Sequence, residues 1–295
     1  KDNIFMTFRA ATQDEMFLYH RQRLSFVYET DWGFRFNTSL RLQSNRTVGN
    51  LHYYKMDSTE VKKIRMADLT VGINYNPGVT YVNTKQQRLP INLDSPEIGI
   101  THTMGFSGFL GGQYKSNITK VSIYKRQWLG SWGYLDFHAN AQAQWNKVPF
   151  QMLIMPPINL SYFEQEETVS MMKDWEFLND RQVFWALSWD MNGKLLNRIP
   201  LIKKLKWREW LAIKGVYGHL TDKNNPFLEK NKNDDTIFLF PKGSDVMGNT
   251  PYWECVVGVH NIFKFFAVEY VRRLTYINRP GIHKGGVRFN FMMSF

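Results

Sequence analysis

The chain ends on the stretch VRFNFMMSF, residues 287–295, in which every second side chain is large and apolar. Successive side chains of a β-strand point to opposite faces, whereas a helix with a period of 3.6 residues would scatter the apolar positions around its axis. The stretch therefore predicts a final strand whose apolar face is made by Val287, Phe289, Phe291, Met293 and Phe295.

The same alternation recurs along the chain and is clearest over residues 133–145. Odd positions from Leu135 to Trp145 are apolar there, and even positions from Asp136 to Gln144 are polar. The pattern predicts about twelve strands, several as long as the ~9–11 residues that a tilted strand needs to cross a bilayer. They are expected near residues 4–10, 16–29, 33–44, 66–76, 98–106, 116–128, 133–145, 182–192, 207–219, 252–262, 265–277 and 286–295. Three of them, 16–29, 207–219 and 265–277, alternate poorly, which suggests that some of their polar residues face protein or rise above the membrane.

Composition favours a membrane barrel over a soluble fold. The mean hydropathy of −0.40 looks soluble, yet aromatic residues make up 16% of the chain and include ten Trp. A barrel accounts for both values, because only alternate residues face lipid and aromatic rings collect at the two interfaces. The predicted fold is all-β, a transmembrane antiparallel β-barrel that occupies residues 1–295 as one domain. A soluble β-sandwich with the same rings in its core is the architectural alternative.

The terminal strand resembles the C-terminal signal by which outer-membrane proteins are recognised by the barrel assembly machinery. Seven further stretches resemble the barrel of a Bacteroidota outer-membrane family, in which a carboxypeptidase-regulatory-like domain precedes a barrel of unassigned function. They are GGQY (111–114), WLG (128–130), VPF (148–150), WEFLNDR (175–181), LLNRIPL (195–201), GVHNIFK (258–264) and YVRRLTY (270–276). The resemblance runs from about Ile98 to Phe295 and extends distantly to barrels of the BamA and TamA type. It implies an outer-membrane, multi-pass protein, with membrane lipids, lipopolysaccharide and the assembly machinery as partners, and a chain that is the C-terminal part of a longer one.

The lengths of the connections support an orientation with the C-terminus in the periplasm. Outer-membrane barrels have short periplasmic turns and longer external loops. With that orientation the three longest connections, 45–65, 146–181 and 220–251, are external, and the turns at 30–32, 129–132 and 263–264 are periplasmic. Residues 77–97 and 193–206 are the exceptions, since both are long connections on the periplasmic side. The mixture of Leu, Ile, Lys and Arg in 193–206 predicts a short amphipathic element on the inner rim.

Charge and metal-binding residues argue against several classes of function. The net charge of +11 is scattered without a basic run, which favours loops near anionic headgroups over a nucleic-acid-binding surface. The single cysteine, Cys255, excludes an internal disulfide and a cysteine-based metal site within one chain. The seven histidines are dispersed, and no two have the spacing of a metal-binding motif, so no metal and no other cofactor is expected.

Two small sets of residues are candidates for chemistry. Asp136 and His138 share the polar face of one predicted strand, where a carboxylate can orient an imidazole. A shared lumen network explains the same pair without catalysis. Glu176, Asp180 and Arg181 precede the strand at 182–192 and are expected to fold inward, so that all five residues form a possible lumen charge cluster.

The expected function is a non-catalytic component of outer-membrane transport, assembly or a partner complex, and the protein is not expected to be an enzyme. A lumen-gated channel and a barrel enzyme acting on lipid or peptide are the alternatives.

Overall fold

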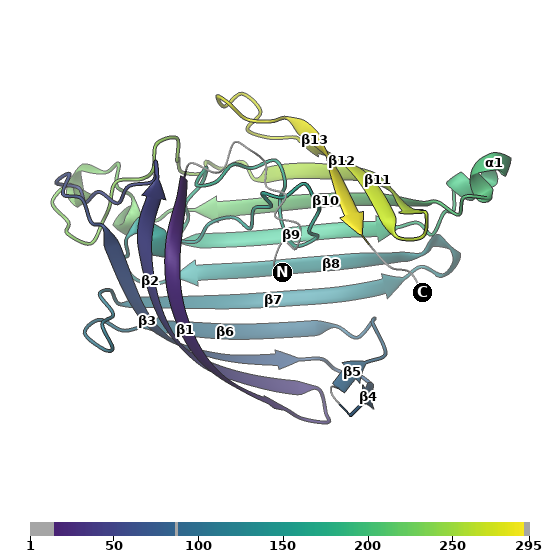
Figure 1. Cartoon of the computed structure of the whole chain (residues 1–295), viewed down its shortest axis with the longest axis horizontal. Coiled ribbons are helices and arrows are strands. Elements are labelled where there is room, and N and C mark those ends of the chain that lie inside the picture. Colours follow the sequence, from purple (N-terminus) through teal and green to yellow (C-terminus); the bar gives the residue numbers. More distant parts are fainter. Residues whose placement is uncertain (1–14, 86–87, 292–295) are drawn as a thin grey trace.

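A computed structural model describes residues 15–85 and 88–291. Within these residues, eleven strands form one antiparallel sheet whose spatial order follows the sequence. The strands are β1 (Glu15–Glu29), β2 (Phe34–Gly49), β3 (Lys63–Tyr75), β6 (Glu97–Gly105), β7 (Ser116–Trp128), β8 (Tyr134–Gln144), β9 (Arg181–Asp190), β10 (Arg208–His219), β11 (Tyr252–Ile262), β12 (Phe266–Arg273) and β13 (Gly285–Phe291). Figure 1 shows the sheet curved into a barrel wall, with β1 at one side and β13 at the other. The predicted all-β barrel fold is confirmed.

The side-chain alternation predicted from sequence is present in the wall. On β9, Phe184, Ala186 and Ser188 are buried, while Val183 and Leu187 are exposed on the opposite face. The register carries this division across the sheet, because Phe137 pairs with Leu187 and His138 pairs with Ala186. One face is therefore an exposed apolar belt, and the other, here called the inward face, carries most of the polar side chains of β7–β12.

Strand boundaries mostly follow the predictions. The strands at 116–128 and 252–262 are observed with those limits. The strand expected at 265–277 ends at Arg273, and the chain then turns, with Tyr276 at a φ of 53°. The connection 77–97 contains a short hairpin of β4 (Tyr81–Asn83) and β5 (Arg88–Pro90). It was not predicted, because strands of three residues are too short to show an alternating pattern. The strand expected at 4–10 and the last four residues of the chain lie outside the described residues.

The three long connections pack against one another at one end of the wall, the left-hand end in Figure 1. Their shared hydrophobic core includes Tyr53, Phe150, Trp175, Leu178 and Phe238. Short 3-10 turns stiffen two of these connections: η3 (Phe150–Met152), η5 (Asp222–Asn224) and η6 (Glu229–Asn231). Buried apolar packing is thus made largely by loops, together with smaller clusters in which loop residues contact inward-facing side chains of β9–β12.

The opposite end carries the tight turns and the one amphipathic element expected there. Residues between β9 and β10 form η4 (Leu196–Arg198) and the helix α1 (Pro200–Lys203), and η2 (Gly130–Trp132) makes the β7–β8 turn. Figure 1 shows α1 projecting from this end, where β13 also ends at Phe291. In the part of the chain that the structure describes, no helix has the length and apolarity to cross a bilayer.

Candidate functional site: a loop bound to the inward face

The connection between β8 and β9, residues 145–180, does not stay at the rim. Its middle part lies against the inward face of β10–β13, in front of β9 and β10 in Figure 1. It carries a dense set of polar contacts with inward-pointing side chains of the wall, and these contacts make it the most distinctive feature of the described barrel.

Lys214 of β10 is the first of these anchors. Its ammonium group pairs with the carboxylate of Glu164, and both side chains are 3% exposed. The same group donates to the backbone carbonyls of Gln165 at 3.0 Å and Thr168 at 2.9 Å. A lysine is rarely buried unless it is paired, so three acceptors around one ammonium account for its position.

Glu254 of β11 binds the next part of the loop. Its carboxylate accepts hydrogen bonds from the backbone N–H of Ser170 at 2.9 Å and of Met171 at 3.1 Å. The hydroxyl of Tyr252 donates to it at 2.9 Å, and the Ser170 hydroxyl donates to Glu164 at 2.6 Å. Backbone donors and a neutral hydroxyl thus satisfy a carboxylate that is fully buried.

Arg273 of β12 forms the third anchor. Its guanidinium makes a bidentate pair with Glu176, with Nη2–Oε1 at 2.6 Å and Nη1–Oε2 at 3.0 Å. It also donates to the backbone carbonyl of Met171 at 3.3 Å. Bidentate pairing fixes the geometry as well as the charge, so the two ends of the segment 164–176 are both held by buried ion pairs.

The loop also pairs with the backbone of β13. The N–H of Phe289 donates to the carbonyl of Tyr162 at 2.9 Å, and the N–H of Glu164 donates to the carbonyl of Phe289 at 2.7 Å. These bonds form a parallel bridge on the edge of β13 that faces away from β12. An unpaired strand edge presents free backbone groups, and here the loop occupies part of that edge.

The predicted charge cluster is distributed over separate partners. Asp136 pairs with Arg126 at 2.5 and 2.7 Å, and the His138 ring packs at a tilt against the Tyr124 ring, with the two centroids 4.5 Å apart. The imidazole lies near two loop carboxylates, with His138 Nε2 3.9 Å from Glu166 Oε2 and Nδ1 3.7 Å from Glu167 Oε1. Burial, together with the negative charge of Asp136, raises the pKa of Glu166.

Asp180 and Arg181 lie where the long loop meets the start of β9. Asp180 accepts hydrogen bonds from the N–H and hydroxyl of Thr221 and, at 2.9 Å, from the side-chain amide of Asn224. The Arg181 guanidinium lies over the Trp145 ring, 4.1 Å from its centroid. Glu176 alone pairs deep inside, with Arg273. No hydrogen bond or ion pair joins any two of the five predicted residues across the described ranges.

Several of the most buried charged residues were not singled out from the sequence. Besides Lys214, Glu254 and Arg273, the structure pairs His260 Nε2 with Glu269 Oε1 at 2.7 Å beneath the Trp210 ring. A signal was present, because strands 207–219 and 265–277 alternate poorly. Lys214 and Arg273 lie on these two strands and bind the loop, whereas Glu254 and His260 lie on the strand at 252–262, which gave no such signal.

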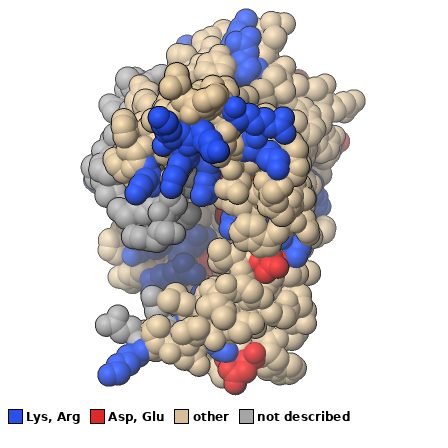
Figure 2. All heavy atoms as spheres, turned by 90° about the vertical axis from the view of Figure 1, so that its right-hand side faces the viewer, with Lys and Arg blue, Asp and Glu red and all other residues tan. Residues whose placement is uncertain are grey.

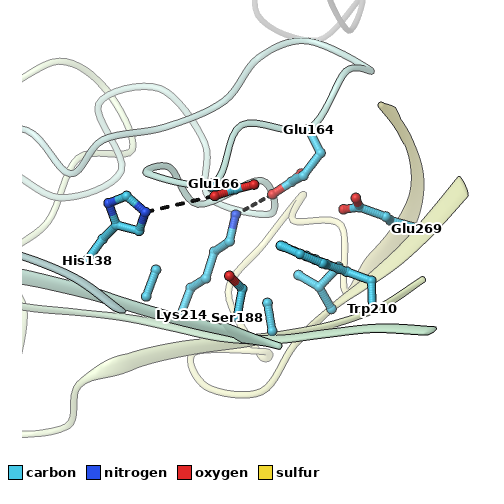
Figure 3. Close-up of a pocket in the computed structure, with 10 residues that line it drawn as sticks. His138, Glu164, Glu166, Ser188, Trp210, Lys214 and Glu269 are labelled. Atoms are coloured by element: carbon cyan, nitrogen blue, oxygen red, sulfur yellow. Dashed lines mark hydrogen bonds and ion pairs between the residues drawn. The ribbon is translucent and has the colours of Figure 1, made fainter. Parts of the chain in front are cut away.

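The loop leaves little space on one side of the interior and more on the other. Between the loop and β9–β12 the cavity is about 10 Å³, room for about one water molecule. Figure 3 shows His138, Glu166, Glu164, Lys214 and Ser188 around it, with the Lys214–Glu164 and His138–Glu166 pairs dashed. A polar hollow of about 340 Å³ lies beside β6–β8, lined by residues that include Lys120, Tyr124, His138 and Glu167.

The described residues contain no group of three or more His, Cys, Asp or Glu side chains arranged to hold a metal ion. The absence of a metal or cofactor stays a prediction, as does the absence of catalysis.

A family profile described as "Family of unknown function (DUF5686) C-terminal domain" matches residues 5–231. The chain belongs to this family. The Bacteroidota origin and the preceding carboxypeptidase-regulatory-like domain stay predictions. No curated protein matches the chain.

Two solved structures share the fold. BamA from Haemophilus ducreyi lacking POTRA domains 1–3 superposes with a TM-score of 0.58 at 10% identity, over 93% of this chain and 55% of that one. CdiB from Escherichia coli gives a TM-score of 0.51 at 14% identity, over 92% and 44%. The chain thus spans about half the length of these proteins, and at such identities the likeness establishes the barrel fold alone.

Proposed function

We propose that this family member is an outer-membrane β-barrel with a periplasmic C-terminus, serving as a non-catalytic component of transport, assembly or a partner complex. Its wall supports the membrane part of the proposal. Exposed apolar residues recur at alternate positions across neighbouring strands, among them Val71, Ile73, Ile98, Ile100, Val121, Ile123, Phe137, Val183, Leu187, Leu211, Ile213 and Val257. Soluble proteins rarely expose so continuous an apolar surface, whereas a lipid-facing wall requires one.

Aromatic residues at the turn end support the same placement. Trp32, Trp128, Trp132, Phe263 and Phe265 are all exposed there, with Trp32 at 73% and Phe263 at 81%. Rings with this exposure are typical of the girdles at membrane–water interfaces. β13 ends at this same end, so a periplasmic C-terminus would put this girdle at the periplasmic leaflet.

The preference for such a component over a channel rests on one observation, the loop 145–180 bound to the inward face. Lys214–Glu164 and Arg273–Glu176 hold both ends of segment 164–176, so the interior beside β9–β12 is filled rather than open. A filled lumen suits a protein that works through its surfaces and its partners. These would be membrane lipids, lipopolysaccharide, the barrel assembly machinery during biogenesis, and other outer-membrane proteins.

Two measurements test this proposal. Purified protein inserted into planar bilayers is expected to give no steady pore current, and detergent extracts of native membranes are expected to yield a stable complex with defined protein partners. Steady currents from the unmodified protein would contradict the proposal, as would a monomer without partners after mild extraction.

The lumen-gated channel remains the second candidate because the 340 Å³ hollow is polar and lies beside the loop. A variant lacking residues 159–173 separates the two readings. If the protein is a gated channel, removing this segment is expected to give steady currents. If it is a scaffold whose lumen stays closed by other residues, the shortened protein is expected to give none.

The enzyme alternative has less support. The carboxylate of Asp136 is bound by Arg126 rather than by His138, and no hydrogen bond joins His138 to the nearby Ser188 hydroxyl. Asp136→Ala and His138→Ala variants are expected to leave any lipid- or peptide-hydrolysing activity unchanged. A selective loss in either variant would revive that reading.

A further inference from the structure

The connection between β9 and β10 is an ordered element rather than a loose loop. Glu209 accepts the backbone N–H groups of Leu195 and Leu196, and α1 begins at Pro200, whose ring suits the first turn of a helix. The N–H of Lys203 donates to the carbonyl of Ile199 at 2.9 Å. The chain therefore presents a fixed surface at this position.

That surface is basic. Residues 193–206 contain five cationic side chains and no Asp or Glu: Lys194, Arg198, Lys203, Lys204 and Lys206. Figure 2, which looks onto this end of the molecule, shows Lys and Arg gathered over its upper half with little acidic surface among them. The segment therefore carries a local excess of positive charge, with no carboxylate of its own to balance it.

The same surface is apolar as well. No residue of α1 is buried, and Leu201 is 78% exposed. Leu195, Ile199 and Leu205 are about half exposed, at 46%, 48% and 50%. Four aliphatic side chains in solvent are unfavourable in water, and they lie within a few residues of the lysines, which is the composition of an interfacial segment.

Two neighbouring turns extend this surface. The side-chain amide of Asn261 donates to the carbonyl of Lys206 at 2.7 Å, which places the β11–β12 turn with Phe263 and Lys264 beside the segment. Lys194 donates to the Ser131 hydroxyl at 2.9 Å and lies 5.3 Å from the Trp132 ring centroid. We call residues 194–206 with Trp132 and Phe263–Phe265 the basic rim.

We propose that the basic rim binds the anionic phospholipid headgroups of the leaflet at the turn end of the barrel, with Leu201 and Phe263 at the boundary between headgroups and acyl chains. The inference rests on the proposed membrane placement and adds a lipid specificity to it. Cationic residues beside exposed apolar ones, at the level of an aromatic girdle, match an anionic bilayer surface better than they match water or a purely polar partner.

The experiment places a nitroxide on α1 of the full chain. Leu201→Cys carries the label in a Cys255→Ser background, and the protein is reconstituted into vesicles of phosphatidylcholine alone or with added phosphatidylglycerol. Accessibility to oxygen and to a water-soluble nickel complex then reports depth. Adding phosphatidylglycerol is expected to lower nickel accessibility several-fold while oxygen accessibility rises.

A charge reversal tests the source of this effect. Lys203→Glu with Lys204→Glu is expected to abolish the response to phosphatidylglycerol. The matched control is Lys62→Glu with Lys63→Glu, two exposed lysines at the opposite end of the wall, and it is expected to leave the response at position 201 intact. Every sample is first checked for the heat-modifiable gel migration of a folded barrel.

The outcomes are distinguishable. Equal water accessibility of the label in both vesicle types, in a folded and inserted barrel, would overturn the inference and leave the proposed function standing. Equal effects of the two charge reversals would also overturn it, because the response would then report bulk electrostatics. If Lys203→Glu with Lys204→Glu loses a co-purifying protein but keeps the response to phosphatidylglycerol, the rim binds a protein partner instead. Failure of the unmodified chain to insert into vesicles would refute the membrane placement itself.

Discussion

Arg273 and Glu176, 97 positions apart in the chain, form a bidentate ion pair with N–O distances of 2.6 and 3.0 Å and side-chain exposures of 0% and 3%. The pair joins the inward face of β12 to the last part of the long loop. Two desolvated charges are tolerated inside a fold only when each has its partner. The stability of the barrel is therefore expected to depend on the loop keeping Glu176 in contact with Arg273.

Glu176→Gln is expected to lower the free energy of unfolding by about 3–5 kcal/mol, because it leaves the buried guanidinium without a counter-charge. The measurement is denaturant unfolding of the reconstituted barrel followed by tryptophan fluorescence. Glu229→Gln is the matched control, since its pair with Lys232 is exposed on both sides. The control is expected to lose less than about 1 kcal/mol of unfolding free energy, as is usual for surface pairs. An equally small loss in Glu176→Gln would argue against a stabilising role for the buried pair.

Lys214→Met is expected to release the first part of the loop. Glu164 would lose its buried counter-charge, and two backbone carbonyls would lose their donor. Limited proteolysis should then cut within residues 159–173 faster than in the unmodified protein. Lys230→Met, at an exposed pair with Asp222, provides the comparison and should leave the cleavage rate unchanged. An unaltered cleavage pattern in Lys214→Met would show that the remaining anchors suffice.

Asp234 gives a dependence of stability on pH. Partial burial opposes ionisation, but the Lys147 ammonium at 2.6 Å and the N–H of Thr236 lower the pKa of this carboxyl below its ordinary value of 3.8. A carboxyl with a lowered pKa contributes stability above its unfolded pKa and loses it as the pH falls through the folded pKa. Unfolding midpoints of the unmodified protein should therefore fall more steeply below pH 3.8 than those of Asp234→Asn. Parallel pH profiles would contradict the assignment.

The lipid-facing direction of the wall is tested at two adjacent positions of β9. Leu187 points outward and is 39% exposed, whereas Ser188 points inward with no hydrogen-bond partner for its hydroxyl. Leu187→Arg is expected to cost about 2–4 kcal/mol if the residue lies near the bilayer midplane, and to reduce the fraction that folds into vesicles. Ser188→Ala should fold as the unmodified protein does. Equal folding of both variants would favour the soluble alternative.

Strand positions were largely predictable because the signal is local. Polar side chains from Asp136 to Gln144 alternate with apolar ones whatever the rest of the chain does, and the strand at 134–144 follows directly. The short hairpin at Tyr81–Pro90 escaped prediction, since three residues cannot display a period. The candidate site was only partly predictable. Glu176 was expected to turn inward and does, but its partner Arg273 lies on a poorly alternating strand and was not foreseen.

The sequence by itself determined the fold class, the long strands and, where the alternation is regular, which residues share a face, because a period of two is read from neighbours alone. Phe289 and Phe291 were assigned to one apolar face in this way. Only the tertiary structure decided that Tyr162 and Glu164 pair with the edge of Phe289 and that Lys214 and Arg273 hold the loop inside. Those contacts depend on the path of a long connection. That path is set by which buried charges find partners across the barrel, and no local pattern encodes it.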